Sequence, residues 1–406
     1  MINKNPTVEF RRQISLYLTK YRAILNTSRL LSGFGYQYSN IAYICLSISQ
    51  NNCRKYATKS MKLFQLHGKL STQQSLFLGI AGLLILLGFW WGLSEVLSEQ
   101  KPLISEVDTS IIEGYEKVYP ILPRPDKVFM AYGSLINKDN LWGNTFRSVW
   151  LNLKGYFWAV LVAIPIGFLT SLIPLVRGLF SRQVDALRYL PLTALTGLFI
   201  IWFGIEDQMK IAFLAFGILV YLLPVVIQRI DETEDVYLKT SSTLGATAWQ
   251  KITTVYLPAV FSKLIDDIRV LTAISWTYII IAELLNREGG IGALIYVKAR
   301  QGQIDKVFAV LIVIILIGFM QDRIFAYIDK RIFPHKYYKV NFMGLKEIRY
   351  GIWTVLGIFA LKVFQEITLP TLDSTISSFV WIGVLASLAF ILYGEFKFWN
   401  AKKAVS

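Results

Sequence analysis

The sequence is poor in the residues on which many enzymes and secreted domains depend. Its 406 residues include two cysteines and two histidines. So few cysteines exclude a scaffold stapled by disulfides. The histidines and cysteines do not cluster, so we predict no metal site. The patterns G-x-x-x-x-G-K-[ST], G-x-S-x-G and Glu-x-x-His do not occur in it either. We therefore predict that the chain is not an enzyme and has no nucleotide-binding loop or cofactor of its own.

Charge is scarce as well, because charged residues make up 17% of the chain and hydrophobic residues 54%. A globular domain carries about a quarter charged residues. The run from Gln74 to Leu93 has no charge, and about 20 apolar residues are enough to cross a bilayer as a helix. We predict a polytopic membrane protein, which excludes a soluble enzyme and, despite a net charge of +15, a nucleic-acid-binding domain. The eight predicted spans are 74–93, 148–172, 186–204, 209–228, 265–285, 306–322, 350–366 and 376–394.

The distribution of Lys and Arg predicts the orientation of these spans. Residues 1–73 hold eleven basic residues and one acid, which is typical of a cytoplasmic segment. Alternation then places residues 94–146 outside, residues 229–263 inside and both termini in the cytoplasm. Residues 286–305 disagree, because they should be external yet carry Arg287, Lys298 and Arg300. We interpret them as a partly re-entrant segment whose charges face a cavity.

The chain divides into three parts by composition. Residues 1–73 are a basic cytoplasmic segment, residues 74–334 hold six spans, and residues 335–406 are a basic linker with two more spans. Residues 1–60 are rich in Ser, Tyr, Asn and Arg and leave several alternatives open. They are a targeting sequence, a cytoplasmic extension without fixed structure, or upstream sequence that is not translated, in which case the protein starts at Met61.

The loop 229–263 carries the most information about function. Its pattern is a helix, a glycine, a second helix and a proline. Gly245 can adopt the positive φ that other residues resist, and Pro258 interrupts or opens the following helix. We predict a rigid knob close to the membrane that fits into the groove of a partner.

This loop resembles the EAA loop of ATP-binding-cassette (ABC) importer permeases. The resemblance rests on Gly245, nine further residues and then Val255-Tyr256-Leu257-Pro258. The positions of the family's Glu-Ala-Ala hold Lys239, Thr240 and Ser241 here, so the acidic contact of the family is missing or reversed. Four further segments, at 122–135, 187–211, 281–295 and 322–332, are similar to the nitrate, sulfonate, taurine and bicarbonate branch of these permeases.

The resemblance implies a fold, a function and a set of partners. The fold is an all-α polytopic membrane protein, with a core of about six helices as in type I ABC importer permeases plus two additional transmembrane helices. The chain would import a small anionic or zwitterionic solute across a bacterial inner membrane, as one of a homodimer or permease pair. Cytoplasmic ATPase subunits would bind Mg-ATP, and an extracytoplasmic solute-binding protein would deliver the solute. The alternatives are a gradient-driven secondary carrier or, in third place, a polytopic membrane enzyme.

Two groups of residues are the candidates for function. The resemblance implies that one group docks the ATPase subunit. Lys210 and Glu283 form the other group, since ionisable residues at membrane depth often face a pathway. Lys210 could instead snorkel to the interface, and Glu283 could instead cap a helix end. The predicted docking residues are Lys239, Thr240, Ser241, Leu244, Gly245, Ala246, Trp249, Val255, Leu257 and Pro258.

Overall fold

The computed structural model describes residues 70–104, 112–285, 289–338, 343–368 and 373–405. The alternatives for residues 1–60 therefore lie outside the described residues. The chain forms two compact units, Met1–Gly88 and Phe89–Ser406. The described part of the first unit is the beginning of helix α4 (Thr72–Val96), which is long and uniformly apolar.

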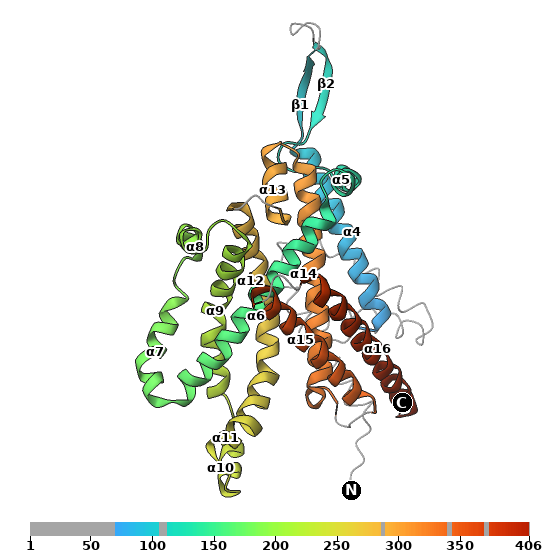
Figure 1. The fold of residues 1–406 in the computed structure, drawn as a ribbon. Helices are drawn as coiled ribbons and strands as arrows, with labels where there is room; N and C mark the ends of the chain where they lie inside the picture. The colour runs from blue at the N-terminus through green and yellow to red at the C-terminus, as the bar shows by residue number, and fades with distance from the viewer. Residues whose placement is uncertain (1–69, 105–111, 286–288, 339–342, 369–372, 406) are drawn as a thin grey trace, which may run out of the picture. The chain divides into compact units, whose positions relative to one another are not determined.

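The second unit is built mainly of helices (Figure 1). The predicted all-α fold is confirmed, but this unit also contains a β-hairpin that the sequence analysis did not predict. Strands β1 (Glu99–Ile104) and β2 (Ile112–Val118) form an antiparallel hairpin in which Glu99 lies opposite Val118. The helices of this unit are α5 (Pro125–Asn137), α6 (Leu141–Leu172), α7 (Pro174–Leu187), η1 (Leu192–Leu195), α8 (Thr196–Phe203), α9 (Asp207–Asp231), α10 (Asp235–Thr243), α11 (Ala248–Lys251), the π-helix η2 (Ile252–Tyr256), α12 (Leu257–Leu285), α13 (Ile291–Arg300), α14 (Ile304–Ile332), η3 (Pro334–Lys336), α15 (Leu345–Thr368) and α16 (Asp373–Val405).

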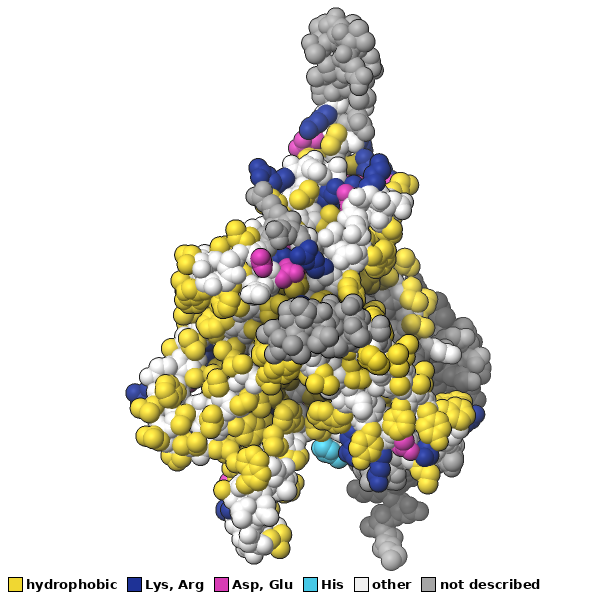
Figure 2. Space-filling view, in the orientation of Figure 1, with side chains coloured by type: hydrophobic (Ala, Val, Ile, Leu, Met, Phe, Trp, Pro, Cys, Tyr) yellow, Lys and Arg dark blue, Asp and Glu magenta, His cyan; other side chains and the backbone are white. Residues whose placement is uncertain are grey.

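Six helices among the described residues are long and apolar enough to cross a membrane. They are α4, α6, α9, the continuous run Ala248–Leu285, α14 and residues Phe379–Ala401 of α16. The predicted span 350–366 lies within α15, which has 24 residues and is not one of the six. Figure 2 shows hydrophobic side chains over most of the visible surface of the second unit, with charged ones gathered toward the helix ends.

The predicted straight span 186–204 is wrong. Helix α7 ends at Leu187, and the following pair of η1 and α8 is bent from it by 95°. The break contains Pro191, which lacks an N–H group and disfavours the helical conformation of the residue before it. Helix α7 and the pair of η1 and α8 together form at most one broken span, which would be a seventh crossing of the membrane.

The core of the second unit lies where α6 packs against α9 and α12. Small residues on one face of α6 allow the close approach. A Cβ atom at Gly155 would lie 2.5 Å from Leu214, and one at Gly167 would lie 2.5 Å from Val226. Ala159 and Ala163 lie between these glycines and are buried.

The two C-terminal helices pack against each other and onto α6 and α14. Phe359 of α15 contacts Phe157 of α6 edge to face, with ring centroids 5.8 Å apart. Lys154 and Glu366 form an ion pair of 2.8 Å between the same two helices. Glu395 of α16 pairs with Arg331 of α14 at 2.6 Å. The added helices are therefore an integral part of this unit.

Candidate functional site

The helix, glycine turn and second helix predicted for the loop 229–263 are present. Helix α10 ends in a Schellman motif, in which the N–H of Ala246 donates to the carbonyl of Ser241 and the N–H of Gly245 donates to that of Ser242. Gly245 has φ +75°, which lies in the left-handed region. A side chain there would meet no steric obstacle, so backbone conformation is what requires the glycine.

A capping box that the sequence analysis missed begins the second helix. The hydroxyl of Thr247 accepts from the backbone N–H of Gln250, and the side-chain oxygen of Gln250 accepts from the N–H of Thr247 at 2.8 Å. The sequence Thr-Ala-Trp-Gln is the S/T-x-x-E/Q signature of this motif, so the signal was available. The turn is thus fixed from both sides, by a C-cap before Gly245 and an N-cap after it.

The second helix of the loop continues without a break into a membrane helix. Helix α11 passes into the π-helix η2 and then into α12, in whose first turn Pro258 lies. Because Pro258 has no N–H group, the α-helical bond to the carbonyl of Thr254 cannot form. The wider π-turn lies directly before this proline. Residues Ala248–Leu285 therefore form one continuous helical run from the loop into the membrane helix.

The tip of the loop is an exposed knob, which we define as residues 235–251, and it carries several large apolar side chains. Leu244 and Trp249 are 82% and 71% exposed, and Val236 and Tyr237 are exposed as well. Lys239 is also exposed and lies 3.7 Å from Asp235. The knob is the lowest protrusion on the left of Figure 2.

The remaining predicted docking residues divide between the knob and its base. The hydroxyls of Thr240 and Ser241 donate to carbonyls of their own helix, those of Val236 and Leu238. Val255 and Leu257 lie at the base and are half-buried, whereas Pro258 is exposed.

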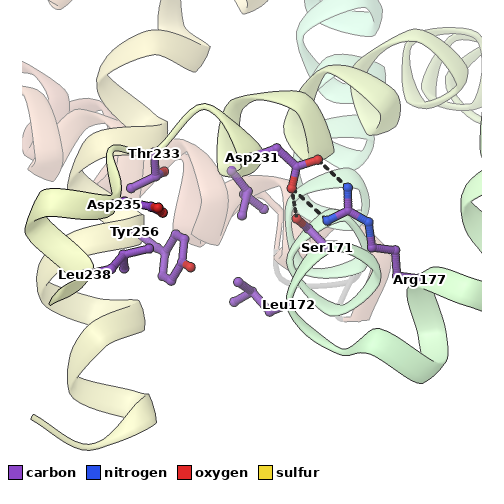
Figure 3. A pocket seen from close by; sticks show the side chains of 9 residues that line it. Ser171, Leu172, Arg177, Asp231, Thr233, Asp235, Leu238 and Tyr256 are labelled. Atoms are coloured by element: carbon purple, nitrogen blue, oxygen red, sulfur yellow. Dashed lines mark hydrogen bonds and ion pairs between the residues drawn. The ribbon is translucent and has the colours of Figure 1, made fainter. Parts of the chain in front are cut away.

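A pocket of about 240 Å³ lies where the knob joins the membrane helices (Figure 3). On one side, Asp231 at the end of α9 pairs with Arg177 of α7 at 2.6 Å and accepts from Ser171 of α6 at 3.0 Å. Thr233, Asp235, Leu238 and Tyr256 line the other side. The pocket therefore lies between the start of the knob and the ends of α6 and α7.

Ion pairs next to this pocket connect α9 to α12. Arg229 contacts both carboxylate oxygens of Asp267, at 2.7 and 2.8 Å, and pairs with Glu232 at 2.6 Å. The hydrogen bond from Arg229 lowers the pKa of Glu232, so this carboxylate is ionised at neutral pH. Sequence spacing did not indicate the pair of Arg229 and Asp267, because these residues are 38 positions apart.

Lys210 and Glu283, the two candidates for the pathway, are both fully buried. Lys210 pairs with Asp207 at 3.0 Å, and Asp207 also contacts Arg147 at 3.1 Å. Glu283 accepts from the hydroxyl of Ser148 at 2.6 Å and from the backbone N–H of Gly292 at 2.8 Å. Glu283 therefore caps a helix end, although that end belongs to α13 and not to its own helix. A role of either residue in the pathway stays a prediction.

The basic residues of the discordant segment 286–305 have a different explanation from the predicted cavity. Lys298 is 8% exposed and pairs with Asp139 at 2.6 Å, and Lys306 pairs with the same carboxylate at 2.9 Å. Arg300 lies over the ring of Tyr296. The carboxylate of Asp139 thus offsets one of the two lysine charges. Arg287 lies outside the described residues.

The structure defines a polytopic membrane protein with a protruding loop of a helix, a glycine turn and a second helix. Residues 158–334 match the model of the binding-protein-dependent transport system inner membrane component. A predicted ABC transporter permease protein of Methanocaldococcus jannaschii is 30% identical over 227 residues, which are 55% of this chain and 82% of that protein. The chain belongs to this family of ABC transporter permeases.

Two further relatives come from bacteria. A predicted aliphatic sulfonates transport permease protein of Bacillus subtilis is 26% identical over 215 residues, covering 52% of this chain and 77% of the relative. The taurine transport system permease protein of Escherichia coli is 25% identical over 270 residues, covering 65% and 91%. The family match ends at residue 334, so α15 and α16 lie beyond it.

Membership of this family has three consequences. The chain is a multi-pass membrane protein and a transport subunit, not an enzyme, and ATP hydrolysis belongs to a partner subunit. The family implies two kinds of partner, an ATPase and a solute-binding protein. The alternatives of a gradient-driven carrier and a membrane enzyme are set aside.

Proposed function

We propose that this chain is the permease subunit of an ATP-driven importer and that residues 235–251 dock onto its ATPase subunit. The observation that carries the proposal is the rigid, exposed knob. Leu244 and Trp249 are largely exposed at its tip, and tryptophan is enriched among the residues that contribute most to binding at protein interfaces. The ATPase subunit binds the Mg-ATP, and this chain holds no nucleotide.

The connections of the knob support a mechanism for coupling. The knob continues through η2 into α12 on one side and joins α9 through residues 232–234 on the other. Both helices pack against α6, and Arg229 ties them together beside the pocket. Movement of the knob as the ATPase subunits close would therefore tilt α9 and α12 together. An exchange of two states in this manner links ATP binding to access from either side.

The proposed substrates are small anionic or zwitterionic solutes. Two of the relatives are named for the transport of aliphatic sulfonates and of taurine, and the sequence resemblance adds nitrate and bicarbonate. We propose a sulfonate or taurine-like solute first, because both relatives carry that description. The solute-binding protein would dock on the external side, at α5 and at the turn with Glu206 and Asp207.

Co-purification tests the docking proposal. Gly245→Val places a β-branched side chain at φ +75°, a conformation that costs an L-residue about 1–2 kcal/mol. The knob is exposed, so the membrane body should keep its thermal stability while the ATPase subunit is lost from gently solubilised complexes. The matched control is Gly178→Val, because a side chain at Gly178 likewise meets no obstacle and its φ is ordinary. An ATPase subunit absent from the native protein, or retained equally by both variants, would contradict the proposal.

Uptake into proteoliposomes tests the substrate. The complex with its binding protein and ATP should accumulate labelled taurine or an alkanesulfonate, and unlabelled competitors should reduce this uptake. Competition by nitrate or bicarbonate alone would move the assignment to another solute of the same charge class. Uptake driven by an ion gradient without ATP would overturn the importer mechanism.

A further inference from the structure

The outer end of the second unit contains a buried carboxylate with no part in the coupling loop. Glu283 lies near the end of α12 and is fully buried. An ionised carboxylate is costly to bury unless hydrogen bonds satisfy it. Two donors do so here, the hydroxyl of Ser148 at 2.6 Å and the backbone N–H of Gly292 at 2.8 Å.

The same cluster satisfies the first N–H groups of α13, which have no partner within their own helix. Ser148 accepts from the N–H of Ile291 at 2.8 Å while it donates to Glu283. Asn144 accepts from the N–H of Gly290 at 3.0 Å. Three successive backbone groups of one helix are thus bound by side chains from two others, α6 and α12.

The glycines of the segment GGIG follow from this arrangement. A Cβ atom at Gly290 would overlap the carboxylate of Glu283, and one at Gly292 would lie 2.7 Å from the carbonyl oxygen of Ile280. Gly290 also has φ +103°. The backbone approaches Glu283 so closely that only glycine fits at both positions.

The far end of α13 is fixed as well, because Lys298 pairs with Asp139 just before α6. We propose that Glu283 is a positioning residue that fastens α13 to α6 and α12, so that these three segments move as one body during transport. The carboxyl group suits this place because both of its oxygens accept hydrogen bonds. An amide would turn a donor toward either Ser148 or Gly292.

A distance measurement tests this proposal separately from the proposed import function. Nitroxide labels are placed at Phe146→Cys on α6 and Val297→Cys on α13, two positions that are 66% and 38% exposed. Cys45→Ser and Cys53→Ser remove the native thiols. The full chain should give one narrow distance distribution by pulsed electron resonance. In the complex with its ATPase subunit, that distribution should be the same without nucleotide and after trapping with ATP and vanadate.

Glu283→Gln should broaden the distribution of distances between the two labels. The ratio of chains with α13 held against α6 to chains with α13 released should fall about tenfold, equivalent to about 1.4 kcal/mol. ATP-driven uptake should fall in parallel. Glu99→Gln, at an exposed position, should leave both unchanged. If Glu283→Gln does not fold, Ser148→Ala removes the bridge between Glu283 and Ile291 and should broaden the distribution in the same way, with Ser134→Ala as its control.

Two outcomes would overturn the proposal. A distribution as narrow in the folded variants as in the native chain would show that other contacts hold α13. A native distance that changes between the two nucleotide states would show that α13 moves relative to α6. Neither result depends on which solute is imported, so a failure of the proposed substrate remains distinguishable.

Discussion

Single residues fix the two ends of the second unit through charge and backbone conformation. At the end opposite the knob, Asp139 pairs with two lysines and Glu283 caps a helix. At the knob, Gly245 provides the positive φ that a Schellman motif needs. The conformation of Gly245 could be predicted from local sequence. The pairing of Asp139 with Lys298 and Lys306, and of Glu283 with Ser148, could not, because these partners lie more than a hundred positions away along the chain.

Asp139→Asn should destabilise the protein by about 3 kcal/mol, because it leaves two largely buried ammonium groups without a counter-charge. Lys298, Lys306 and Asp139 are 8%, 13% and 14% exposed. Thermal unfolding in detergent measures the effect. Asp185→Asn is the control, since that carboxylate is 61% exposed. Equal midpoints for the two variants would contradict a stabilising role of the triad.

The same triad predicts a dependence on pH. Burial by itself raises the pKa of Asp139, but hydrogen bonds and charge from Lys298 and Lys306 lower this pKa below its ordinary value. A lowered pKa in the folded state means that the stabilisation is present above the unfolded value of about 3.9 and is lost as the pH falls through the folded value. Asp139→Asn should therefore cost stability at pH 7 and cost little once Asp139 is protonated in both states.

Thr247→Ala removes the capping box and should cost about 1 kcal/mol of local stability. Because the knob is exposed, the loss should be confined to it. Hydrogen–deuterium exchange of the amides at 248–251 should accelerate, while exchange in α9 stays as it was. Thr243→Ala is the matched control, since that hydroxyl donates to a carbonyl of its own helix. Unchanged exchange at 248–251 would show that the capping box does not stabilise this helix.

The helices themselves were predicted well where they are long and apolar, and less well where they bend. Composition identified α4, α6, α9, α12 and α14, because 20 apolar residues identify a membrane span whatever they pack against. The predicted span 186–204 was wrong, because a hydropathy window does not register a bend at Pro191. The hairpin of β1 and β2 was missed. The contacts between α6 and α15, namely Phe157 with Phe359 and Lys154 with Glu366, were not predicted either, because they depend on how helices far apart in the sequence pack.

The ion pair between α6 and α15 can be tested by exchanging its two charges. Lys154 and Glu366 are 14% and 26% exposed and lie 2.8 Å apart. Lys154→Glu and Glu366→Lys should each destabilise the protein, and the double variant should recover a coupling energy of about 2 kcal/mol. Thermal unfolding of all four proteins gives this energy. Additive losses in the double variant would show that the two charges do not interact.

In the whole second unit, the knob and the C-terminal ends of α9, α14 and α16 lie toward the same end, and the hairpin and α13 lie toward the other (Figure 1). This arrangement agrees with the alternation derived from the basic residues. The side of the membrane on which each end lies is still a prediction. It follows from the Lys and Arg content of the loops.

Reporter fusions test the orientation. A fluorescent protein fused after Ser406 should fluoresce and alkaline phosphatase at this position should be inactive, as expected in the cytoplasm. A phosphatase inserted at Lys138, between α5 and α6, should be active. A reporter inserted at Gly245 should behave like the one at Ser406. Active phosphatase after Ser406 would mean that α15 and α16 together cross the membrane once.

The sequence by itself determined the class of protein, most of the spans, the glycine turn of the knob and the family. Each of these depends on composition or on residues close together in the chain, where local conformational preference and transfer into lipid dominate the free energy. The tertiary structure decided the bend after α7, the pairing of Asp139 with two lysines, the capping of α13 by Glu283 and the attachment of α15 to α6. These depend on which distant side chains meet in a medium without water, where an unpaired charge or N–H group is too costly to remain.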